Sequence, residues 1–291
     1  MSTVLHIVPG TDDVANGMVV VARLLAKEQG DAEVVDLNHG IRRMRESNIE
    51  EVWVHGMWLP KEWQVCWHAL KAGKKLVRMT HGSLSPIYRT QQSPWKKRLV
   101  GPIERFLLRR SAKIVATCEA EKGWIVAYLG KRCPPIEVTD IKRFFKLNNL
   151  NLVNPVNPVK KDLNLLYLGR RHPLKGVEYL ETAVRQIEKN SACSASSRLC
   201  VKYISSAFGA ELEKVWDWCD VLVLPTLSEN FGLVIAEALE RGKRIITTDG
   251  APAWGDGNDY GGRLIYLKGY RDGSPEKRVE LLREALTTLM S

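Results

Sequence analysis

Residues 228–238 read Ser-Glu-Asn-Phe-Gly-Leu-Val-Ile-Ala-Glu-Ala, a stretch in which Glu229 and Glu237 lie eight residues apart. The short apolar run 221–224 before it predicts a buried strand, and the apolar residues from Leu233 onward predict a helix that ends near residue 242. A strand, a short loop and a helix in this order direct free backbone N–H groups and a positive dipole end toward an anion.

The two carboxylates indicate what surrounds that anion. A carboxylate placed against a phosphate would repel it. Glu229 and Glu237 therefore suit hydroxyl groups on either side of a diphosphate, such as those of a sugar and of a ribose. The same spacing is also typical of a solvated helix start with two surface acids, and spacing alone leaves both interpretations open.

A second strand, loop and helix lie upstream. The run 165–168 predicts a strand, residues 169–176 (Gly-Arg-Arg-His-Pro-Leu-Lys-Gly) form a basic loop, and a helix is expected from 177 to about 189. The planar guanidinium of Arg170 can form two hydrogen bonds to a phosphate, and Lys175 adds a point charge. The terminal glycines let the backbone approach the phosphate closely. Such a loop alone is usually only solvated. One cationic unit together with one unit of paired carboxylates favours a nucleotide-sugar site.

Strands and helices alternate along the whole chain, which predicts an α/β fold with open, mostly parallel sheets. The expected strands lie near 4–8, 33–36, 52–55, 75–79, 113–117, 164–168, 199–204, 221–224, 244–247 and 264–267. The expected helices lie near 17–29, 61–72, 95–110, 119–129, 176–189, 210–217, 232–241 and 276–290. An Asn- and Pro-rich stretch, 148–158, is a plausible linker and divides the chain into domains 1–147 and 148–291.

Composition agrees with a soluble globular protein. A chain of 291 residues can form two domains with a core each, and 45% hydrophobic with 26% charged residues is ordinary for such proteins. No apolar run approaches eighteen residues and the start lacks a basic signal region, so neither a membrane-spanning helix nor a signal peptide is expected. The six cysteines show no metal-binding spacing, which favours free thiols in a reducing cytoplasm.

These motifs resemble those of the family-four retaining glycosyltransferases of the GT-B fold. The loop 169–176 resembles the donor-phosphate loop of that family, 229–237 its paired-glutamate motif, and 246–252 the loop that follows. In the first half, residues 54–58, 80–86 and 93–98 match the family as well. The likeness runs from about 50 to 130 and from 163 to 255.

The resemblance implies two doubly wound, Rossmann-like domains that face each other across a cleft, with their ligand loops at the carboxyl ends of the strands. The N-terminal domain would hold the acceptor and the C-terminal domain the nucleotide sugar. The last helix is a candidate to pack back onto the N-terminal domain. The activity implied is retaining transfer of a sugar from a nucleoside-diphosphate sugar to a glycan or lipid-linked acceptor, in lipopolysaccharide or surface-polysaccharide synthesis.

The resemblance also gives the site residues their roles. Glu237 would bind the ribose hydroxyls and Glu229 those of the transferred sugar, while His81 would contact the donor sugar beside the reacting centre. Arg170 and Lys175 would neutralise the departing diphosphate. The catalytic set is therefore His81, Arg170, Lys175 and Glu229. The donor site as a whole comprises Gly169, Arg170, Lys175, Glu229, Asn230, Phe231, Gly232, Leu233 and Glu237.

Two further expectations concern the acceptor side and metals. Asn16 and Gly17, in the loop after the first strand, would join His81 on the acceptor side. For His81 alone, a loop histidine that caps a strand end remains the alternative. No metal and no cofactor are expected, because the two cations and the helix start supply the positive charge that a metal ion would otherwise provide.

The charge is unevenly placed, with a net +8 over residues 1–145 and +2 over 146–291. Residues 89–113 hold eight basic side chains and one acid, Glu104, interleaved with apolar residues. Such a basic amphipathic helix can lie on an anionic bilayer, each basic residue contributing roughly 1 kcal/mol. The expected membrane-facing residues are Lys96, Lys97, Arg98, Arg105 and Arg109.

Two alternatives to the membrane remain for this segment. One is a surface helix with a solvated basic face. The other, nucleic acid, is not expected as a partner, because no nucleic-acid-binding motif accompanies the charge. With the membrane interpretation, the protein would be cytoplasmic and peripheral at the inner face of the plasma membrane.

The sequence also departs from the family. The loop 9–18 has isolated glycines where the family has paired ones, residues 138–141 replace its Pro-Asn-Gly segment, and the stretch 186–214 is short. A second hypothesis follows, in which the chain is a catalytically degenerate GT-B protein that binds a nucleotide sugar or a partner without turnover.

Overall fold

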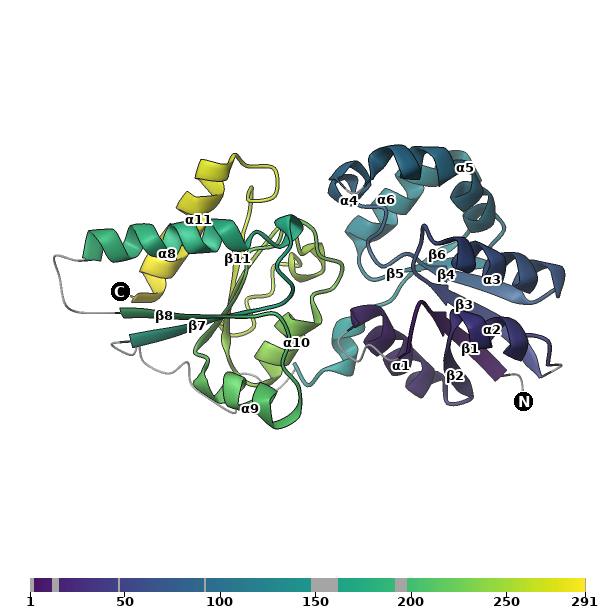
Figure 1. Ribbon diagram of the computed structural model, residues 1–291, viewed down its shortest axis with the longest axis horizontal. Helices are drawn as coiled ribbons and strands as arrows, with labels where there is room; N and C mark the ends of the chain where they lie inside the picture. Colours follow the sequence, from purple (N-terminus) through teal and green to yellow (C-terminus); the bar gives the residue numbers. More distant parts are fainter. Residues whose placement is uncertain are drawn as a thin grey trace. The chain divides into compact units, whose positions relative to one another are not determined.

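The computed structural model describes residues 3–11, 16–46, 48–91, 93–147, 162–191 and 198–290 (Figure 1). The chain divides into two compact units, Met1–Ile141 and Lys142–Ser291, each built on one parallel sheet. The expected linker 148–158 lies outside the described residues, as does Cys193.

The first unit has a six-stranded sheet in the order β2-β1-β3-β4-β5-β6. Its strands are β1 (Thr3–Val8), β2 (Ala32–Asp36), β3 (Ile49–His55), β4 (Lys75–Met79), β5 (Lys113–Ala116) and β6 (Ile136–Val138). Its helices are α1 (Gly17–Gln29), α2 (Leu37–Arg43), α3 (Pro60–Lys71), α4 (Pro86–Gln91), α5 (Pro94–Arg109) and α6 (Glu119–Leu129), followed by a 3-10 turn, η1 (Gly130–Arg132).

The second unit has a five-stranded sheet in the order β11-β10-β9-β7-β8. Its strands are β7 (Asp162–Leu168), β8 (Arg198–Ile204), β9 (Val221–Leu224), β10 (Arg244–Thr248) and β11 (Leu264–Leu267). Its helices are α8 (Val177–Ser191), α9 (Gly209–Trp218), α10 (Leu233–Glu240) and α11 (Pro275–Met290). Short 3-10 turns are η2 (Ile141–Phe144), which begins at the last residue of the first unit, η3 (Pro173–Lys175) and η4 (Pro252–Trp254).

Each sheet reverses its winding direction once. In the first, the chain runs from β1 outward to β2 and returns to β3 on the other side of β1; in the second, it runs from β7 to β8 and returns to β9. Because parallel crossovers are right-handed, the reversal puts helices on both faces. In the second unit α8 and α11 lie on one face and α9 and α10 on the other (Figure 1). Ligands bind such sheets at the carboxyl ends of the strands, beside the reversal point.

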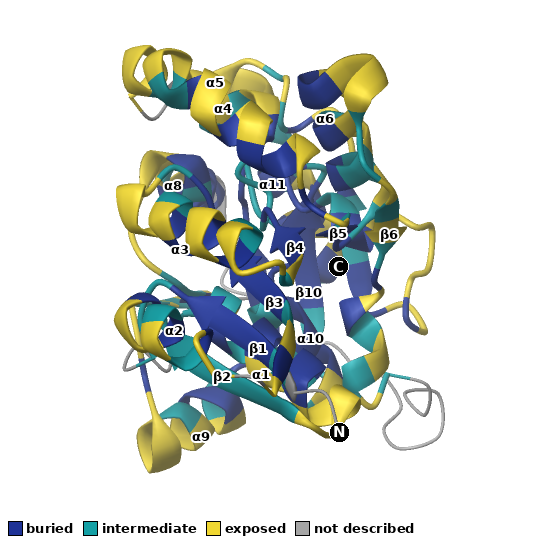
Figure 2. Ribbon diagram, turned by 90° about the vertical axis from the view of Figure 1, so that its right-hand side faces the viewer, coloured by how far each residue is buried: buried dark blue, intermediate teal, exposed yellow. Residues whose placement is uncertain are grey.

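The cores explain why the apolar runs form strands. Parallel strands covered on both faces are almost continuously apolar. The whole of β9, Val-Leu-Val-Leu, is buried, as are most residues of β3 and β4. Figure 2 shows these first-unit strands buried while the outer faces of α2, α3 and α5 are exposed. Val8, Val19 and Ala22 form a separate small core between β1 and α1.

The predicted α/β class with two Rossmann-like sheets is confirmed. Every predicted strand is present within the described residues, and each predicted helix lies within a few residues of its expected bounds. The sequence analysis missed β6, α2 and α4. β6 is only three residues long and follows two prolines, and α2 and α4 are only one to two turns long, too short to show a hydrophobic period.

Three loops of the second unit form one layer at the carboxyl ends of β7, β9 and β10. Leu227 donates its N–H to the carbonyl of Leu174 at 2.8 Å, and Glu229 donates to the carbonyl of Gly250 at 2.8 Å. The loops are so close that a Cβ on Gly176 would lie 2.1 Å from the carbonyl oxygen of Pro225. Gly176 also has a φ of +63°. Only glycine fits this position, and the loop 169–176 is thereby fixed against the β9 loop.

Replacing Gly176 with alanine is expected to lower the stability of the second unit by about 2–4 kcal/mol, because the strain of a positive φ adds to the contact with Pro225. Gly209 is a matched control, since its φ is +54° but a Cβ there would meet nothing within 4 Å. Gly209→Ala is expected to cost about 1 kcal/mol. Calorimetric unfolding of both variants measures the difference. Equal losses would contradict the close loop packing.

Candidate functional site

The cationic loop and the paired-glutamate loop meet at the reversal point of the second sheet. Lys175 ends the 3-10 turn after β7, Glu229 lies in the loop after β9, and their side chains form an ion pair. Both side chains are about four-fifths covered, with exposed fractions of 22% and 20%. The sequence analysis predicted both residues, and the fold brings them into contact although they are 54 residues apart.

The start of α10 provides the N–H groups that the sequence analysis expected. Gly232 occupies the position before the helix with a φ of +72°, and no side chain caps the first turn. Uncapped N–H groups at a helix start attract anions. Phe231 fixes this loop, because its carbonyl accepts a hydrogen bond from Trp254 Nε1 and its ring packs 5.2 Å from the Trp254 ring. Asn230 donates its N–H to Glu229 Oε1 at 3.3 Å.

Arg170 lies at the exposed rim of the same loop layer. Its carbonyl accepts a hydrogen bond from the Tyr167 hydroxyl at 2.8 Å, which holds the backbone. Its guanidinium makes no hydrogen bond to any described residue. Gly169 precedes it with a φ of +156° and donates its N–H to the carbonyl of Ile204 at 2.9 Å. The loop is thus held by its backbone, and the Arg170 fork is free to bind an anion.

Glu237 lies on α10, one turn beyond the helix start. Burial raises the pKa of its carboxyl, and the nearby Arg241 guanidinium acts in the opposite direction. Within the described part of the chain, no donor forms a hydrogen bond to this carboxylate. A partly desolvated carboxylate without a donor is well suited to accept hydrogen bonds from hydroxyl groups.

In the first unit, His81 lies in a tight turn at the carboxyl end of β4. His81 has a φ of +49° and Gly82 a φ of +72°. The turn is held by Glu121, a fully buried carboxylate from α6. Its Oε1 accepts from Gly82 N–H at 2.5 Å and Thr80 Oγ1 at 2.6 Å, and its Oε2 accepts from the N–H and hydroxyl of Thr117 at 2.8 and 2.9 Å. The sequence analysis missed Glu121, because nothing in the sequence distinguishes it from Glu119, the other acid in the first turn of α6.

A chain of hydrogen bonds runs from His81 into the sheet. His81 Nε2 lies 2.8 Å from His55 Nδ1, His55 Nε2 lies 2.9 Å from His6 Nδ1, and His6 Nε2 lies 2.8 Å from Gln29 Oε1. Burial lowers the pKa of all three imidazoles, to about 4 for His6 and about 3 for His81, so they are neutral at pH 7. A neutral imidazole donates through one nitrogen and accepts through the other. The tautomer of each ring therefore fixes that of the next.

This histidine chain predicts loss of stability in mild acid. Because the folded pKa values lie below the ordinary 6.5, the unfolded chain binds more protons, and the free energy of unfolding falls as the pH drops from about 6.5 toward 4. Each histidine contributes up to about 1.4 kcal/mol per pH unit. Glu62, whose pKa burial raises to about 7, has the opposite effect. Differences between variants therefore test the chain better than the absolute slope.

We expect His55→Gln to have a shallower loss of stability between pH 6.5 and 4.5 than the parent protein. His68, exposed on α3, is the matched control, and His68→Gln should keep the parent slope. Urea unfolding across this pH range gives the slopes. Parallel curves for His55→Gln and the parent would show that the buried imidazoles do not control the acid response.

Asn16 and Gly17 lie at the carboxyl end of β1, the same edge of the first sheet as His81. Asn16 caps α1, and its Oδ1 accepts from Met18 N–H at 3.1 Å. Gly17 is the exposed first residue of that helix. The predicted acceptor-side residues thus share one sheet edge, and Asn16 also has a structural role at the helix start.

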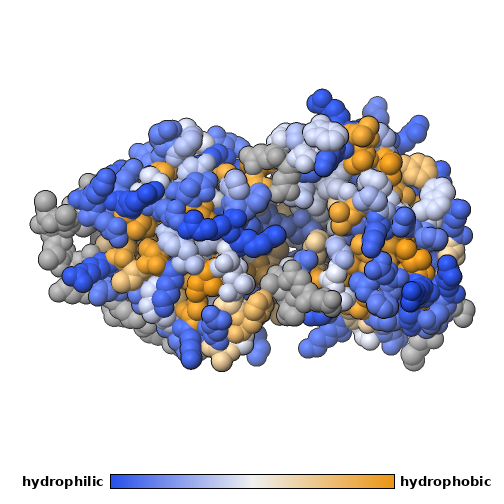
Figure 3. All heavy atoms as spheres, viewed as in Figure 1, coloured by the Kyte–Doolittle hydropathy of each residue, from blue (hydrophilic) through white to orange (hydrophobic). Residues whose placement is uncertain are grey.

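The basic segment around α5 separates into two faces. Lys97, Arg98 and Arg105 line a pocket, and Arg109 donates from Nη2 to the carbonyl of Leu129 at 2.6 Å. Lys96 lies 5.4 Å from the ring centroid of Trp95. The outer face carries four exposed apolar side chains, Trp95, Leu99, Ile103 and Phe106, with exposed fractions of 66, 73, 44 and 42%. Figure 3 shows apolar residues on the surface over α5.

No group of three or more His, Cys, Asp or Glu side chains among the described residues is arranged to hold a metal ion. No helix of the described chain is long and apolar enough to cross a bilayer. The five described cysteines, Cys66, Cys118, Cys133, Cys200 and Cys219, are free thiols.

Two protein-family models match the chain, one in each structural unit. Residues 8–139 match the family model of the glycosyl transferase 4-like domain, and residues 162–266 match that of the glycosyl transferases group 1. No curated protein has a significantly similar sequence.

Solved structures share the whole fold at low sequence identity. A sucrose-phosphate synthase from Thermosynechococcus elongatus aligns with a TM-score of 0.65 and 13% identity over 99% of this chain and 90% of its own. A UDP-forming trehalose-phosphate synthase from Burkholderia vietnamiensis aligns with a TM-score of 0.65 and 11% identity over 100% and 90%. Anabaena HepE, solved in complex with UDP, aligns with a TM-score of 0.57 and 14% identity over 99% and 94%.

Proposed function

The chain belongs to the group 1 glycosyltransferases of the GT-B fold and uses a nucleotide sugar, and on this basis we propose that it is an active retaining enzyme. It transfers the sugar to a glycan or lipid-linked acceptor, in lipopolysaccharide or surface-polysaccharide synthesis. The observation that carries the proposal is the loop layer at β7 and β9, where Lys175, Glu229 and the uncapped start of α10 come together.

The proposed roles follow from the chemistry of glycosyl transfer. As the bond between the sugar and the diphosphate breaks, negative charge builds on the diphosphate oxygen. Lys175, the free guanidinium of Arg170 and the N–H groups of Phe231, Gly232 and Leu233 stabilise that charge, which is usually a large catalytic contribution. Glu229 holds the hydroxyls of the sugar, and the partly desolvated Glu237 holds those of the ribose.

The family resemblance gives His81 a contact with a sugar substrate, and Glu121 holds the His81 turn in place within the first unit. Attack by the acceptor on the face from which the diphosphate departs preserves the anomeric configuration. A uridine diphosphate sugar is the first donor to test, because the structures of similar fold include one solved with UDP and one named as UDP-forming.

A hydrolysis assay over a panel of nucleoside-diphosphate sugars tests the proposal. We expect slow release of nucleoside diphosphate from at least one donor, abolished in Glu229→Ala. The second candidate, a degenerate protein that binds without turnover, is favoured by the isolated glycines of the loop 9–18. Tight binding of a donor with no hydrolysis and no transfer to any acceptor would establish that alternative and contradict ours.

We place the protein at the cytoplasmic face of an anionic membrane. The support is the row of exposed apolar side chains on α5 beside basic residues, together with free thiols that suit a reducing compartment. Vesicle sedimentation should show binding to anionic lipid that weakens with salt and falls in Lys96→Ala/Lys97→Ala/Arg98→Ala and in Leu99→Glu. Equal sedimentation with neutral vesicles would overturn the placement.

A further inference from the structure

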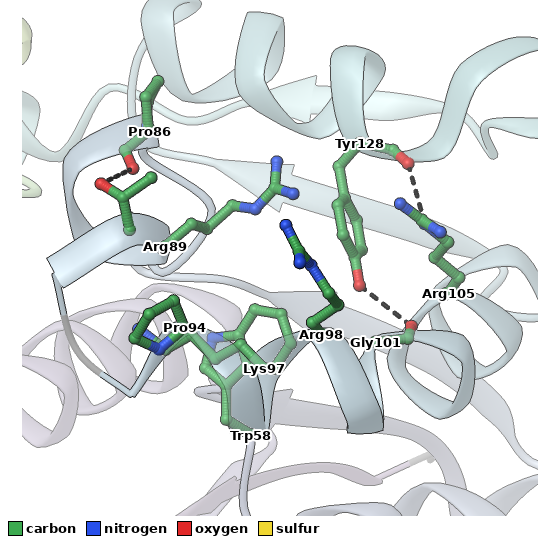
Figure 4. Close-up of a pocket in the computed structure, with 10 residues that line it drawn as sticks. Trp58, Pro86, Arg89, Pro94, Lys97, Arg98, Gly101, Arg105 and Tyr128 are labelled. Atoms are coloured by element: carbon green, nitrogen blue, oxygen red, sulfur yellow. Dashed lines mark hydrogen bonds between the residues drawn. The ribbon is translucent and has the colours of Figure 1, made fainter.

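A pocket of about 410 Å³ opens among the helices of the first unit (Figure 4). Its walls come from α4, α5, α6 and the loop after β3. The six side chains that define it are Trp58, Arg89, Lys97, Arg98, Arg105 and Tyr128. No role in donor binding or catalysis has been assigned above to any of these residues.

The pocket is lined by four cations, and none of its described lining residues carries a carboxylate. The one acid of α5, Glu104, lies behind the pocket wall and is paired with the buried Arg78: it also accepts from the N–H of Trp58 at 2.6 Å and from Trp63 Nε1 at 2.8 Å. Like charges gathered in one pocket repel one another, so the arrangement is stabilised when an anion enters.

Aromatic rings rather than carboxylates hold these cations in place. The guanidinium groups of Arg89 and Arg105 lie 5.0 and 4.6 Å from the ring centroid of Tyr128, and the Lys97 ammonium lies 3.7 Å from that of Tyr88. The Tyr128 hydroxyl donates to the carbonyl of Gly101 at 3.0 Å, which orients the ring. Lys97 Nζ also donates to the carbonyl of Tyr88, and Arg105 Nε donates to that of Tyr128 at 3.3 Å. A cation–π contact itself positions a charge without occupying its N–H groups, and Arg89 is held in this way.

Several donors are therefore available to a ligand. No hydrogen bond or ion pair joins the guanidinium of Arg89 or Arg98 to another described residue, and Figure 4 shows both pointing into the pocket beside Tyr128. Trp58 Nε1 is buried and has no partner within the described chain. Burial, with the charge of Arg89, lowers the pKa of Lys97 to about 8.

We propose that this pocket binds a phosphate group, carried either by the head group of a lipid or by a phosphorylated soluble acceptor. Guanidinium forks match the oxygens of phosphate bidentately, and the volume accommodates a phosphate with the first atoms of the group that bears it. The apolar row on the outer face of the same helix favours a lipid as the source. The inference needs only the first unit and does not depend on turnover.

Calorimetric titration with inorganic pyrophosphate tests the pocket directly. Lys175→Met serves as the background, so that the donor loops contribute less to the measured binding. We expect binding that weakens with salt, and a loss of at least about tenfold in affinity in Arg89→Gln/Arg98→Gln. Arg89→Lys/Arg98→Lys, which keeps the charge but removes the forks, should show an intermediate loss. Arg110→Gln is the matched control, because Arg110 lies over the Phe106 ring outside the pocket.

Unchanged affinity in Arg89→Gln/Arg98→Gln, or an equal loss in Arg110→Gln, would overturn the proposal, with thermal unfolding used to verify that each variant is folded. Phosphatidylcholine vesicles with and without phosphatidic acid then identify the source. If the pocket variants sediment less with phosphatidic acid vesicles than the parent does, and pyrophosphate displaces the parent from these vesicles, the source is a lipid head group. If the pocket variants sediment with vesicles as the parent does, while the parent still binds pyrophosphate, the source is a soluble phosphorylated acceptor. Failure here leaves the donor-hydrolysis result untouched, because that assay uses no acceptor.

Discussion

Replacing Lys175 with methionine is expected to lower kcat/KM for donor turnover by about 10³-fold. The ammonium lies in the loop layer where the diphosphate would depart, and its removal both withdraws a positive charge and leaves Glu229 without its partner. An unpaired carboxylate there repels the diphosphate, which adds to the loss. Removing a single preorganised electrostatic contact typically costs 10²- to 10³-fold, and the two effects act together here.

Two variants make this prediction specific. Lys189→Met removes another lysine side chain, from the exposed face of α8, and should change turnover by less than about twofold. Lys175→Met/Glu229→Gln removes the unpaired carboxylate too, so its donor KM should recover while kcat stays low. Steady-state kinetics on the best donor gives both constants. A loss in Lys175→Met no larger than that in Lys189→Met would refute the role of the lysine.

Arg78→Met is expected to destabilise the first unit by about 3–5 kcal/mol, the cost of leaving one partner of a buried ion pair alone. Arg78 and Glu104 are both fully buried, 3.4 Å apart. Arg78 also donates from Nη2 to the carbonyl of Gly56 at 2.9 Å and from Nη1 to Cys66 Sγ at 3.2 Å. It therefore links β4 to α5, α3 and the loop after β3.

A double variant of Arg78 and Glu104 distinguishes two causes of the lost stability, the unpaired carboxylate and the lost hydrogen bonds of Arg78. If the unpaired Glu104 carboxylate dominates, Arg78→Met/Glu104→Gln should recover about 1–2 kcal/mol, because a neutral amide is less costly to bury. Hydrogen exchange of β4 amides measures the change within the first unit alone. A loss below about 1 kcal/mol in Arg78→Met would contradict a structural role for the pair.

Much of the loop layer of the second unit was predictable because its position follows from topology. The apolar runs 165–168 and 221–224 fix two parallel strands, and the loops after them must emerge at the same edge of the sheet. Gly169, Lys175, Glu229 and Gly232 therefore lie in one layer, as the motifs indicated. The identity of the sugar and of the base depends on loop shape, which the motifs do not specify.

The histidine chain and the buried ion pair were beyond sequence reasoning. His6, His55 and His81 come from β1, β3 and the end of β4, and their contact requires the strand order β1-β3-β4, which the sequence does not reveal. Glu104 looked like the lone acid of a basic surface helix, yet it is fully buried against Arg78. Its partner lies in a strand whose other residues gave no hint of a charge inside the core.

α5 shows a different reason for incomplete prediction. The sequence identified a basic amphipathic helix but could not tell which face meets the core. The structure buries Leu107 and Leu108 and exposes Trp95 and Leu99. Three of the predicted membrane-facing cations, Lys97, Arg98 and Arg105, line the pocket instead of standing among the exposed apolar residues. Their part in membrane binding stays a prediction.

Calorimetry can measure whether the loop layer of the second unit binds a diphosphate, on which the proposed function depends. Uridine, guanosine, adenosine and cytidine diphosphates are first ranked by thermal shift. The best diphosphate and its monophosphate are then titrated into the parent protein and into Lys175→Met. We predict that the parent prefers the diphosphate by at least about tenfold and that Lys175→Met loses this preference. Equal affinity for both nucleotides in the parent, or an undiminished preference in Lys175→Met, would contradict the account.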